Sequence, residues 1–303
     1  MERVRKISMS PKTDPTGRLR KLFIKSRVPL FALLVCALSV AAASTSRTNR
    51  TASSLRMQTT GSFKLRYVAV KDHGLAQIEK LIKESKLFEL LIDDSNKSLK
   101  LPVDITVIFR ECNGKDEDGK DEDPTNAWYN PNNHSITMCY GLIKKSEDLF
   151  KNNEKTEKDL DEAVLGSTAW TFYHEMGHAL IDIYKIAHTG KEEDAADELS
   201  TYILISSGDA GEKAALDGAE DFYREASEDN DLSEEQFADV HSLSKQRFYN
   251  IICWVYGSNT EKYASLTEGA DAILPQGRAG ACEGEYQRIA KAWQNLLASH
   301  LKK

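Results

Sequence analysis

The sequence predicts an α+β fold, with strands in the N-terminal half of the chain and helices in the C-terminal half. All segments with strand-like alternation or many β-branched residues lie before residue 142, whereas helical spacing of apolar residues dominates from residue 159 onward. Because strands come first and helices follow, a doubly wound sheet is not expected. The chain has 303 residues, 41% of them hydrophobic, which is enough for a substantial core.

The N-terminus has the pattern of an export signal. Residues 1–27 contain nine Lys or Arg and two acidic residues, and residues 28–43 (VPLFALLVCALSVAAA) are uncharged and end in small residues. This predicts a signal peptide over residues 1–43, cleaved after Ala43, with an uncleaved N-terminal anchor as the alternative. The Ser/Thr-rich residues 44–62 are expected to form a flexible tether. We therefore expect an exported protein, periplasmic or extracellular, and either free or membrane-anchored.

The remainder of the chain is acidic. Residues 28–303 contain 31 basic and 45 acidic residues, a net charge of −14. Such a surface repels polyanions, so nucleic acid is not expected as a partner.

A folded domain is expected over residues 63–303, and its first half holds the predicted strands. These are 63–70, 103–109 and a pair of strands around an Asn/Pro turn within 126–141. Residues 75–96 have the apolar spacing of a helix. Residues 114–123 (GKDEDGKDED) do not match the register of a calcium loop, so we expect a solvated loop, with a weak cation site as the alternative.

Helices are predicted in the second half from apolar spacing and from capping residues: 159–183, 191–207, 233–257 and 285–301. The third of these has Ser233 as its N-cap, Gln236 at the third helical position and Gly257 as its C-terminal stop.

The first of these helices contains the motif H-E-x-x-H, in residues 173–180 (YHEMGHAL). Positions i and i+4 lie on the same helix face, so His174 and His178 can direct ring nitrogens at one ion, with Glu175 close beside it. The alternative is a chance pattern on a polar helix, and the motif needs a third ligand to form a site.

The next helix offers that third ligand. A histidine at the H-x-x-G-x-x-H offset would fall on position 184, which is Tyr184, so the metzincin pattern is excluded. Glu193 and Asp197 share a helix face through their i, i+4 spacing. We expect Glu193 to bind the ion and Asp197 to accept the other ring N–H of a ligand histidine.

Other residues nearby leave alternatives open. His188 lies in the loop between the two helices and could reach the ion, and Asp194 with Glu198 has the same spacing as the chosen pair. The acidic stretch KEEDAADE could also be a solvated first turn, favoured by the helix dipole without any metal.

H-E-x-x-H followed by E-x-x-x-D on the next helix resembles the gluzincins, the thermolysin-like zinc peptidases. The segment NAWYN followed by MCYG is similar to the edge strand of those enzymes, to which an extended peptide adds as another strand. By this resemblance Asn126 and Ala127 would hold substrate, whereas an ordinary edge strand is the alternative. The resemblance implies a zincin-like fold with the active-site cleft between the strand-containing half and the helical half.

A wider set of segments is similar to a bacterial family of putative metallopeptidases that is labelled a domain of unknown function: NAWYN, MCYG, HEMGHALID, EEDAADE, QRFYNIICWVYG and RAGACEGEYQRIAKAW. The similarity extends from about Phe63 to the C-terminus. The chain departs from the family in the GKDEDGKDED insertion and at Gly141, where the family usually has Glu, so Gly141 is assigned no role.

These features predict a zinc-dependent peptidase that takes peptide or protein substrates. Zn²⁺ would polarise the scissile carbonyl and acidify a water molecule, and Glu175 would act as general base and pass the proton to the leaving amine. The alternative is a non-catalytic zincin-fold module of the cell envelope that binds metal or protein. A purely structural site does not need the glutamate of the motif, which favours the enzyme.

A donor to the substrate oxyanion is expected from the helical half, as the resemblance to thermolysin-like enzymes implies. On a continuous helix over 233–257, His241 and Tyr249 would share a face and Arg247 would turn away from both. We predict His241 as the donor, with Tyr249 as the second choice and packing or capping as the non-catalytic alternative for His241.

Four cysteines follow the apolar N-terminal segment, which in an exported protein indicates two disulfides. Cys112 and Cys139 lie at two strands that flank a loop, so we expect these two to pair. Cys253 and Cys282 would then join the helix over 233–257 to the start of the last helix. Four unpaired buried thiols are the alternative.

Overall fold

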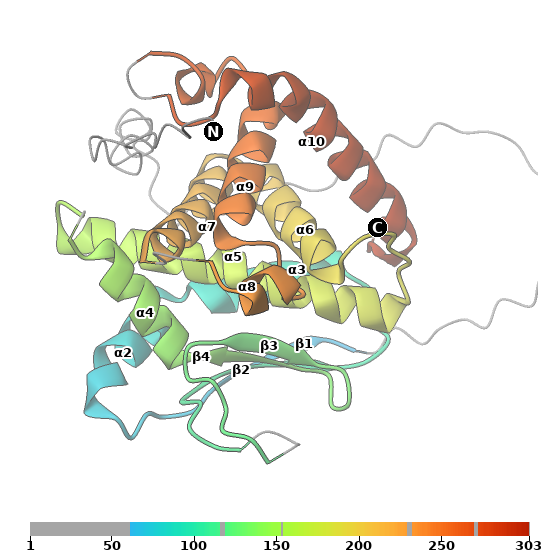
Figure 1. Ribbon diagram of the computed structural model, residues 1–303. Helices are drawn as coiled ribbons and strands as arrows, with labels where there is room; N and C mark the ends of the chain where they lie inside the picture. Colours follow the sequence, from blue (N-terminus) through green and yellow to red (C-terminus); the bar gives the residue numbers. More distant parts are fainter. Residues whose placement is uncertain (1–60, 116–118, 153, 229–231, 270–271, 303) are drawn as a thin grey trace, which may run out of the picture.

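The described part of the chain comprises residues 61–115, 119–152, 154–228, 232–269 and 272–302 of a computed structural model (Figure 1). The predicted signal peptide, the alternative anchor and the predicted tether up to residue 60 lie outside these ranges. Within the ranges, none of the helices combines the length and hydrophobicity that a membrane-spanning segment requires.

The N-terminal half contains a four-stranded sheet, and the three predicted strand regions form it. Its strands are β1 (Phe63–Tyr67), β2 (Ile105–Arg110), β3 (Ala127–Asn130) and β4 (Ser135–Cys139). The order across the sheet is β1-β2-β4-β3, with β1, β2 and β4 parallel and β3 antiparallel to β4. β3 is therefore an edge strand with one side open.

Two helices, α2 (Ala76–Ser85) and α3 (Leu87–Ser98), connect β1 to β2, so the single helix predicted over 75–96 is wrong. The chain breaks at Lys86, whose φ of 57° is left-handed and ends α2. The break places Phe88 of α3 against Phe109 of β2, with ring centroids 4.7 Å apart, so the redirected helix covers the sheet.

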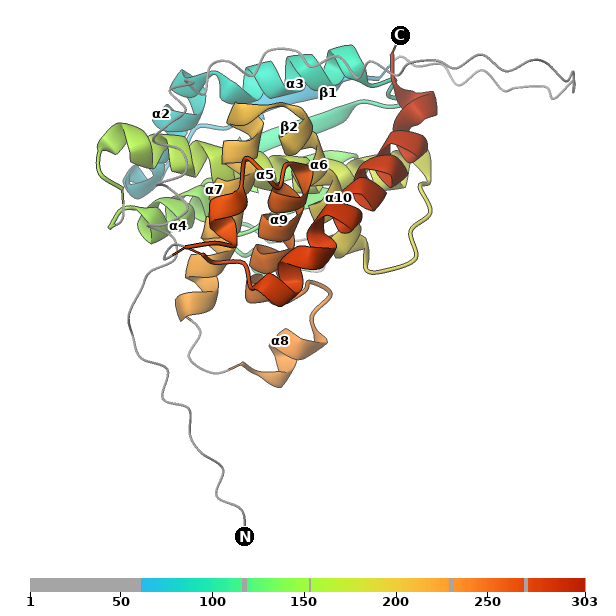
Figure 2. The same cartoon turned by 90° about the horizontal axis from the view of Figure 1, so that it is seen from above.

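The helices after the sheet are α4 (Tyr140–Phe150), α5 (Glu157–Tyr184), α6 (Glu192–Ser206), α7 (Asp209–Glu228), α8 (Glu234–Ala238), α9 (Ser244–Ser258) and α10 (Gln276–Leu297). Short 3-10 helices cover His73–Leu75, Ala264–Leu266 and Ala298–His300. α5 lies between the sheet and the helices α6 and α7 (Figures 1 and 2), in contact with β3 and β4 on one side and with α6 and α7 on the other. The fold is α+β, as predicted; α4 and α7 were not predicted.

The helix predicted over 233–257 is also wrong, because α8 and α9 are separate helices joined by residues 239–243. Ser233 does cap α8: its hydroxyl accepts the N–H of Gln236, whose side chain accepts the N–H of Ser233. Gly257 does not stop a helix but lies inside α9. A Cβ there would come within 2.2 Å of the Cys282 carbonyl oxygen, so the glycine lets α10 pack closely. α10 begins at Gln276, earlier than predicted.

Two disulfides are present among the residues that the structure describes, one in each half of the fold. Cys112 and Cys139 are bonded with their Cα atoms 5.6 Å apart, and Cys253 and Cys282 with theirs 5.0 Å apart. The first fastens the chain after β2 to the end of β4, and the second fastens α9 to α10. Both bonds are compatible with an exported protein.

The insertion over 114–123 is not wholly solvated. The Glu122 carboxylate is largely buried and forms an ion pair with Arg110 of β2 at 2.5 Å, which anchors the loop to the sheet. Residues 116–118 lie outside the described ranges. At Gly141 a Cβ would come within 2.3 Å of the Pro124 carbonyl oxygen, so a residue with a side chain does not fit this backbone.

Candidate active site

The central helix α5 carries the H-E-x-x-H motif in its buried part. Thr156 caps the helix by accepting the N–H of Asp159, and the chain leaves the helix at the left-handed residue Lys185. The His174 side chain is 5% exposed, and Glu175 as a residue is 6% exposed. A polar group so well buried needs partners, because desolvation without compensation is costly.

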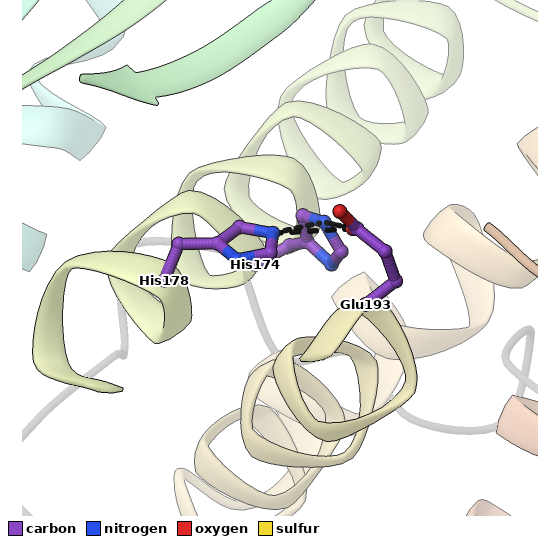
Figure 3. A group of neighbouring side chains, drawn as sticks. All are labelled: His174, His178 and Glu193. Atoms are coloured by element: carbon purple, nitrogen blue, oxygen red, sulfur yellow. Dashed lines mark hydrogen bonds and ion pairs between the residues drawn. The ribbon is translucent and has the colours of Figure 1, made fainter. Parts of the chain in front are cut away.

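Gly177, inside the motif, brings the next helix close. A Cβ at this position would lie 3.1 Å from Ala196 Cα and 3.2 Å from Ala196 Cβ, so the missing side chain allows α6 to approach α5. This approach places the carboxylate of Glu193, in the first turn of α6, beside the two histidine rings of α5 (Figure 3).

The donor atoms of these three side chains converge. His174 Nε2 and His178 Nε2 each lie 3.2 Å from Glu193 Oε2, and the two Nε2 atoms are 3.2 Å apart. Ligand atoms about 2.0–2.1 Å from an ion at tetrahedral angles lie about 3.3–3.4 Å from one another. The three atoms therefore fit one face of a metal coordination tetrahedron, and the group could hold a metal ion.

A carboxylate lies next to the Nδ1 atom of each histidine. Asp197 Oδ1 lies 2.8 Å from His174 Nδ1, although the ring N–H is not well aligned with that oxygen. Glu192 Oε1 lies 2.8 Å from His178 Nδ1. Such carboxylates keep the Nε2 atoms of ligand histidines available to an ion and orient the rings.

Asp197 is held in turn by Arg247 of α9. The guanidinium donates from Nε to Oδ2 at 2.8 Å and from Nη2 to Oδ1 at 2.7 Å. It also lies 4.0 Å from the centroid of the Phe222 ring. Arg247 thus links α9, α6 and α5 behind the histidines.

The carboxyl groups of the site differ in pKa because their surroundings differ. Burial raises the pKa of Glu175, the direction that suits a general base near neutral pH. Burial also acts to raise the pKa of Glu193, but hydrogen bonds from His174, His178 and His241 outweigh it and hold that pKa far below its usual range. Burial acts to raise the pKa of Asp197, but the Arg247 charge, the close contact with His174 and the hydrogen bonds from Arg247 outweigh it and lower that pKa to about 2.

The site opens into a cavity of about 720 Å³ between β3 and the helices. Glu175 and the three converging side chains line it, and Asn126 and Ala127 line it from the sheet side. Cys139 N–H donates to the Asn126 carbonyl at 3.3 Å. By the alternation of an antiparallel pair, the backbone groups of Ala127 and Tyr129 point away from β4 to the open edge. The N–H of Ala127 donates to the Asn126 side chain at 2.9 Å.

His241 lies in the α8–α9 loop rather than on a helix, yet it lines the cavity. Its Nε2 is 2.9 Å from Glu193 Oε2 and its Nδ1 is 2.9 Å from Asp239 Oδ1. The helix-face argument for it was wrong, because no continuous helix exists there. Arg247 is not turned away but lines the cavity, whereas Tyr249 does not line it and packs against Phe248 with ring centroids 4.9 Å apart.

The alternative ligands lie elsewhere. Asp194 Oδ1 accepts a hydrogen bond from Ser242 at 2.8 Å, and His188 Nε2 lies 3.3 Å from Glu192 Oε2. Neither these residues nor Glu198 belong to the converging group found within the described residues.

Two residues of the site were missed from sequence. Glu192 precedes Glu193 in a run of acidic residues that no pattern distinguishes, and only the start of α6 shows that both can face α5. Arg247 was assigned to the wrong face by the assumption of a continuous helix. The segment over residues 239–243 reads DVHSL and contains no Gly or Pro, so no strong sequence signal marks the break.

A family model described as putative metallopeptidase matches residues 67–297, a segment that contains every residue of this site. No curated protein and no solved structure matches the chain. The matched segment covers most of the chain, so the protein belongs to the family of putative metallopeptidases.

Proposed function

We propose that the protein is a zinc-dependent peptidase. The observation that carries the proposal is the convergence of His174, His178 and Glu193 within 3.2 Å of one another on the wall of a cavity that an edge strand also lines. Two imidazoles and one carboxylate are a ligand set of catalytic zinc sites, which keep one position open. When bound there, zinc would polarise a peptide carbonyl and lower the pKa of a water molecule.

Glu175 is the general base in this proposal. Its carboxylate lines the cavity beside the histidines, and burial favours its protonated form once it has accepted the water's proton. It then delivers that proton to the leaving amine. His241 is the donor to the oxygen that becomes negatively charged, because its loop brings Nε2 to within 2.9 Å of Glu193 Oε2 at the cavity wall.

The open edge of β3 is proposed to hold the substrate. An extended peptide would pair with the backbone groups of Ala127 and Tyr129, as peptides add to exposed sheet edges elsewhere. A substrate carbonyl would replace Asn126 Oδ1 at the N–H of Ala127 and release the Asn126 amide for a further contact. Export through the predicted N-terminal signal would bring the enzyme to extracytoplasmic peptides or proteins.

Glu175→Gln in the zinc-loaded protein tests the proposal. A peptidase loses at least about a thousandfold in kcat on a peptide library while keeping one zinc per chain, because the general base is removed and the ligands are retained. Glu84→Gln, at an exposed position of α2, is the matched control and keeps full activity. Absence of cleavage by the wild-type protein in the presence of bound zinc would favour a non-catalytic metal-binding module.

A further inference from the structure

The cavity extends beyond the metal-binding side chains along α5. Ser167 lines it and precedes His174 by seven residues, so it lies on the same helix face and about 10 Å along the axis. Ser146 of α4 and Asp221 of α7 line the cavity with it. Side chains on one face of an extended peptide repeat about every 6.8 Å, so this region is within reach of a residue near the scissile bond.

Asp221 presents an open carboxylate oxygen to this region. The hydroxyls of Ser146 and Ser167 both donate to Oδ2, each at 2.5 Å. No hydrogen bond to Oδ1 is found within the described ranges, and Oδ1 is not among the fully buried atoms that lack a partner. Oδ1 is therefore accessible from the cavity and can accept a donor from a ligand.

The charges here do not balance. Glu225, one turn further along α7, forms an ion pair with Lys145 at 2.6 Å and accepts a hydrogen bond from Ser244 at 2.9 Å. The Lys145 charge also acts on Asp221, and the Arg247 charge acts on Glu225 but is itself paired with Asp197, so three carboxylates face two cationic side chains. A further cation bound here would neutralise the remaining carboxylate charge.

Apolar side chains line the same cavity. Leu142 of α4 and Phe222 of α7 are half-buried there, and the buried Trp170 of α5 also lines the cavity. An apolar wall next to a carboxylate suits a side chain with a methylene stem and a charged end. Lysine and arginine are the amino acids with this build.

We infer that Asp221 is a specificity-determining residue that binds the lysine or arginine side chain of a peptide substrate close to the scissile bond. The inference rests on the proposed peptidase function and adds the substrate class to it. Burial raises the pKa of Asp221, against the opposing hydrogen bonds of Ser146 and Ser167, so a bound cation would favour the ionised form that the empty subsite disfavours.

Matched peptides test the inference on the wild-type zinc-loaded protein. Each pair carries an acetylated N-terminus and an amidated C-terminus and differs at one position, lysine against norleucine, which has the same chain length without the amine. We expect kcat/KM to be at least about tenfold higher for lysine at one position, as for a buried charge-assisted hydrogen bond. Equal rates at every position would overturn the inference.

Asp221→Asn assigns the preference to this carboxylate. The lysine-to-norleucine ratio should fall to near one, because the amide accepts a hydrogen bond but carries no charge. Asp148→Asn, an exposed position of α4 outside the cavity, removes the same charge and should keep the ratio. If Asp221 only ties α4 and α5 to α7, its substitution lowers the melting temperature and leaves the ratio unchanged, which contradicts the inference.

A binding measurement keeps the inference separate from the proposed activity. Fluorescein-labelled lysine and norleucine peptides are titrated into the zinc-loaded Glu175→Gln protein, and their dissociation constants are compared by anisotropy. Tighter binding of the lysine peptide by about tenfold supports the subsite even if no hydrolysis is seen with the wild type. Equal dissociation constants overturn it even if hydrolysis is seen. This comparison needs no variant at Asp221.

Discussion

At the scale of single residues, Asp197 joins the proposed metal-binding side chains to the rest of the fold. It is buried, contacts His174 on one side, and accepts two hydrogen bonds from Arg247 on the other. A buried carboxylate is stable only when it is paired, and the arginine supplies that pairing. Arg247 therefore acts through Asp197 and is a positioning residue for His174.

His241 is expected to act in the transition state. His241→Ala should lower kcat about a hundredfold or more while zinc content and KM change little, because the lost hydrogen bond forms only to the developing oxyanion. Steady-state kinetics and metal analysis check this. Tyr249→Phe, which alters a side chain outside the cavity, is the control. Normal turnover by His241→Ala would remove this residue from the mechanism.

Glu198 should make stability depend on pH. Burial, followed by the charges of Asp194, Asp197 and Glu285, raises its pKa to about 7. The folded protein then holds this proton more strongly than the unfolded chain, so the contribution to stability is present below about pH 4 and is lost as the pH rises through about 7. Glu198→Gln cannot ionise and should raise the free energy of unfolding by about 1–2 kcal/mol at about pH 8, with little change at about pH 4. Urea unfolding of both proteins at both pH values measures this difference. An equal change in unfolding free energy at the two pH values would contradict the raised pKa of Glu198.

At the scale of elements, the packing of α6 on α5 determines whether Glu193 meets His174 and His178. The two helices approach at Gly177 and Ala196, and Ala196 lies three residues after Glu193. A helix is a rigid body over one turn, so a shift at Ala196 moves Glu193 with it. The glycine in the motif is thus a packing residue with a direct consequence for the proposed metal site.

Gly177→Ala should therefore weaken zinc binding. The added Cβ would meet Ala196 at 3.1–3.2 Å, which requires α6 to move by a few tenths of an ångström and separates Glu193 from the histidines. We expect several-fold weaker zinc affinity in competition with a chelator. Gly280→Ala on α10 is the matched control: no atom lies within 4 Å of its added Cβ, and it should leave zinc affinity unchanged and stabilise the helix by about 0.5–1 kcal/mol. Equal zinc affinities for the two variants would argue against packing as the determinant.

At the scale of the whole molecule, the site is assembled from segments far apart in the chain. The edge strand β3, the central helix α5, the start of α6 and the α8–α9 loop each contribute to one cavity. The disulfides connect the surroundings of this cavity: Cys112–Cys139 lies at the strand end beside β3, and Cys253–Cys282 joins the helices that support Arg247.

Removing either disulfide should lower stability but affect activity differently. The closed loops have sequence separations of 27 and 29 residues, so each bond should contribute about 3 kcal/mol by restricting the unfolded chain. The double change Cys112→Ala with Cys139→Ala should also raise KM, because it frees the strand end next to the proposed substrate edge. The change Cys253→Ala with Cys282→Ala serves as its control and should leave KM near the wild-type value. Denaturant unfolding and steady-state kinetics measure both, and equal KM values in the two variants would contradict the role of the β3 edge.

Residue chemistry and local periodicity, which can be read along the chain, determined the α+β class, the strands, the face shared by His174 and His178, and the cysteine pairs expected from flanking elements. These features depend on neighbours within a few positions, where spacing and capping act directly. Only the tertiary structure decided that Glu192 contacts His178 Nδ1, that Arg247 binds Asp197 and that His241 reaches the cavity from a loop. The physical reason is that the α8–α9 break and the approach of α6 to α5 depend on packing between segments far apart in the chain. The spacing of apolar residues within one segment carries no information about such contacts.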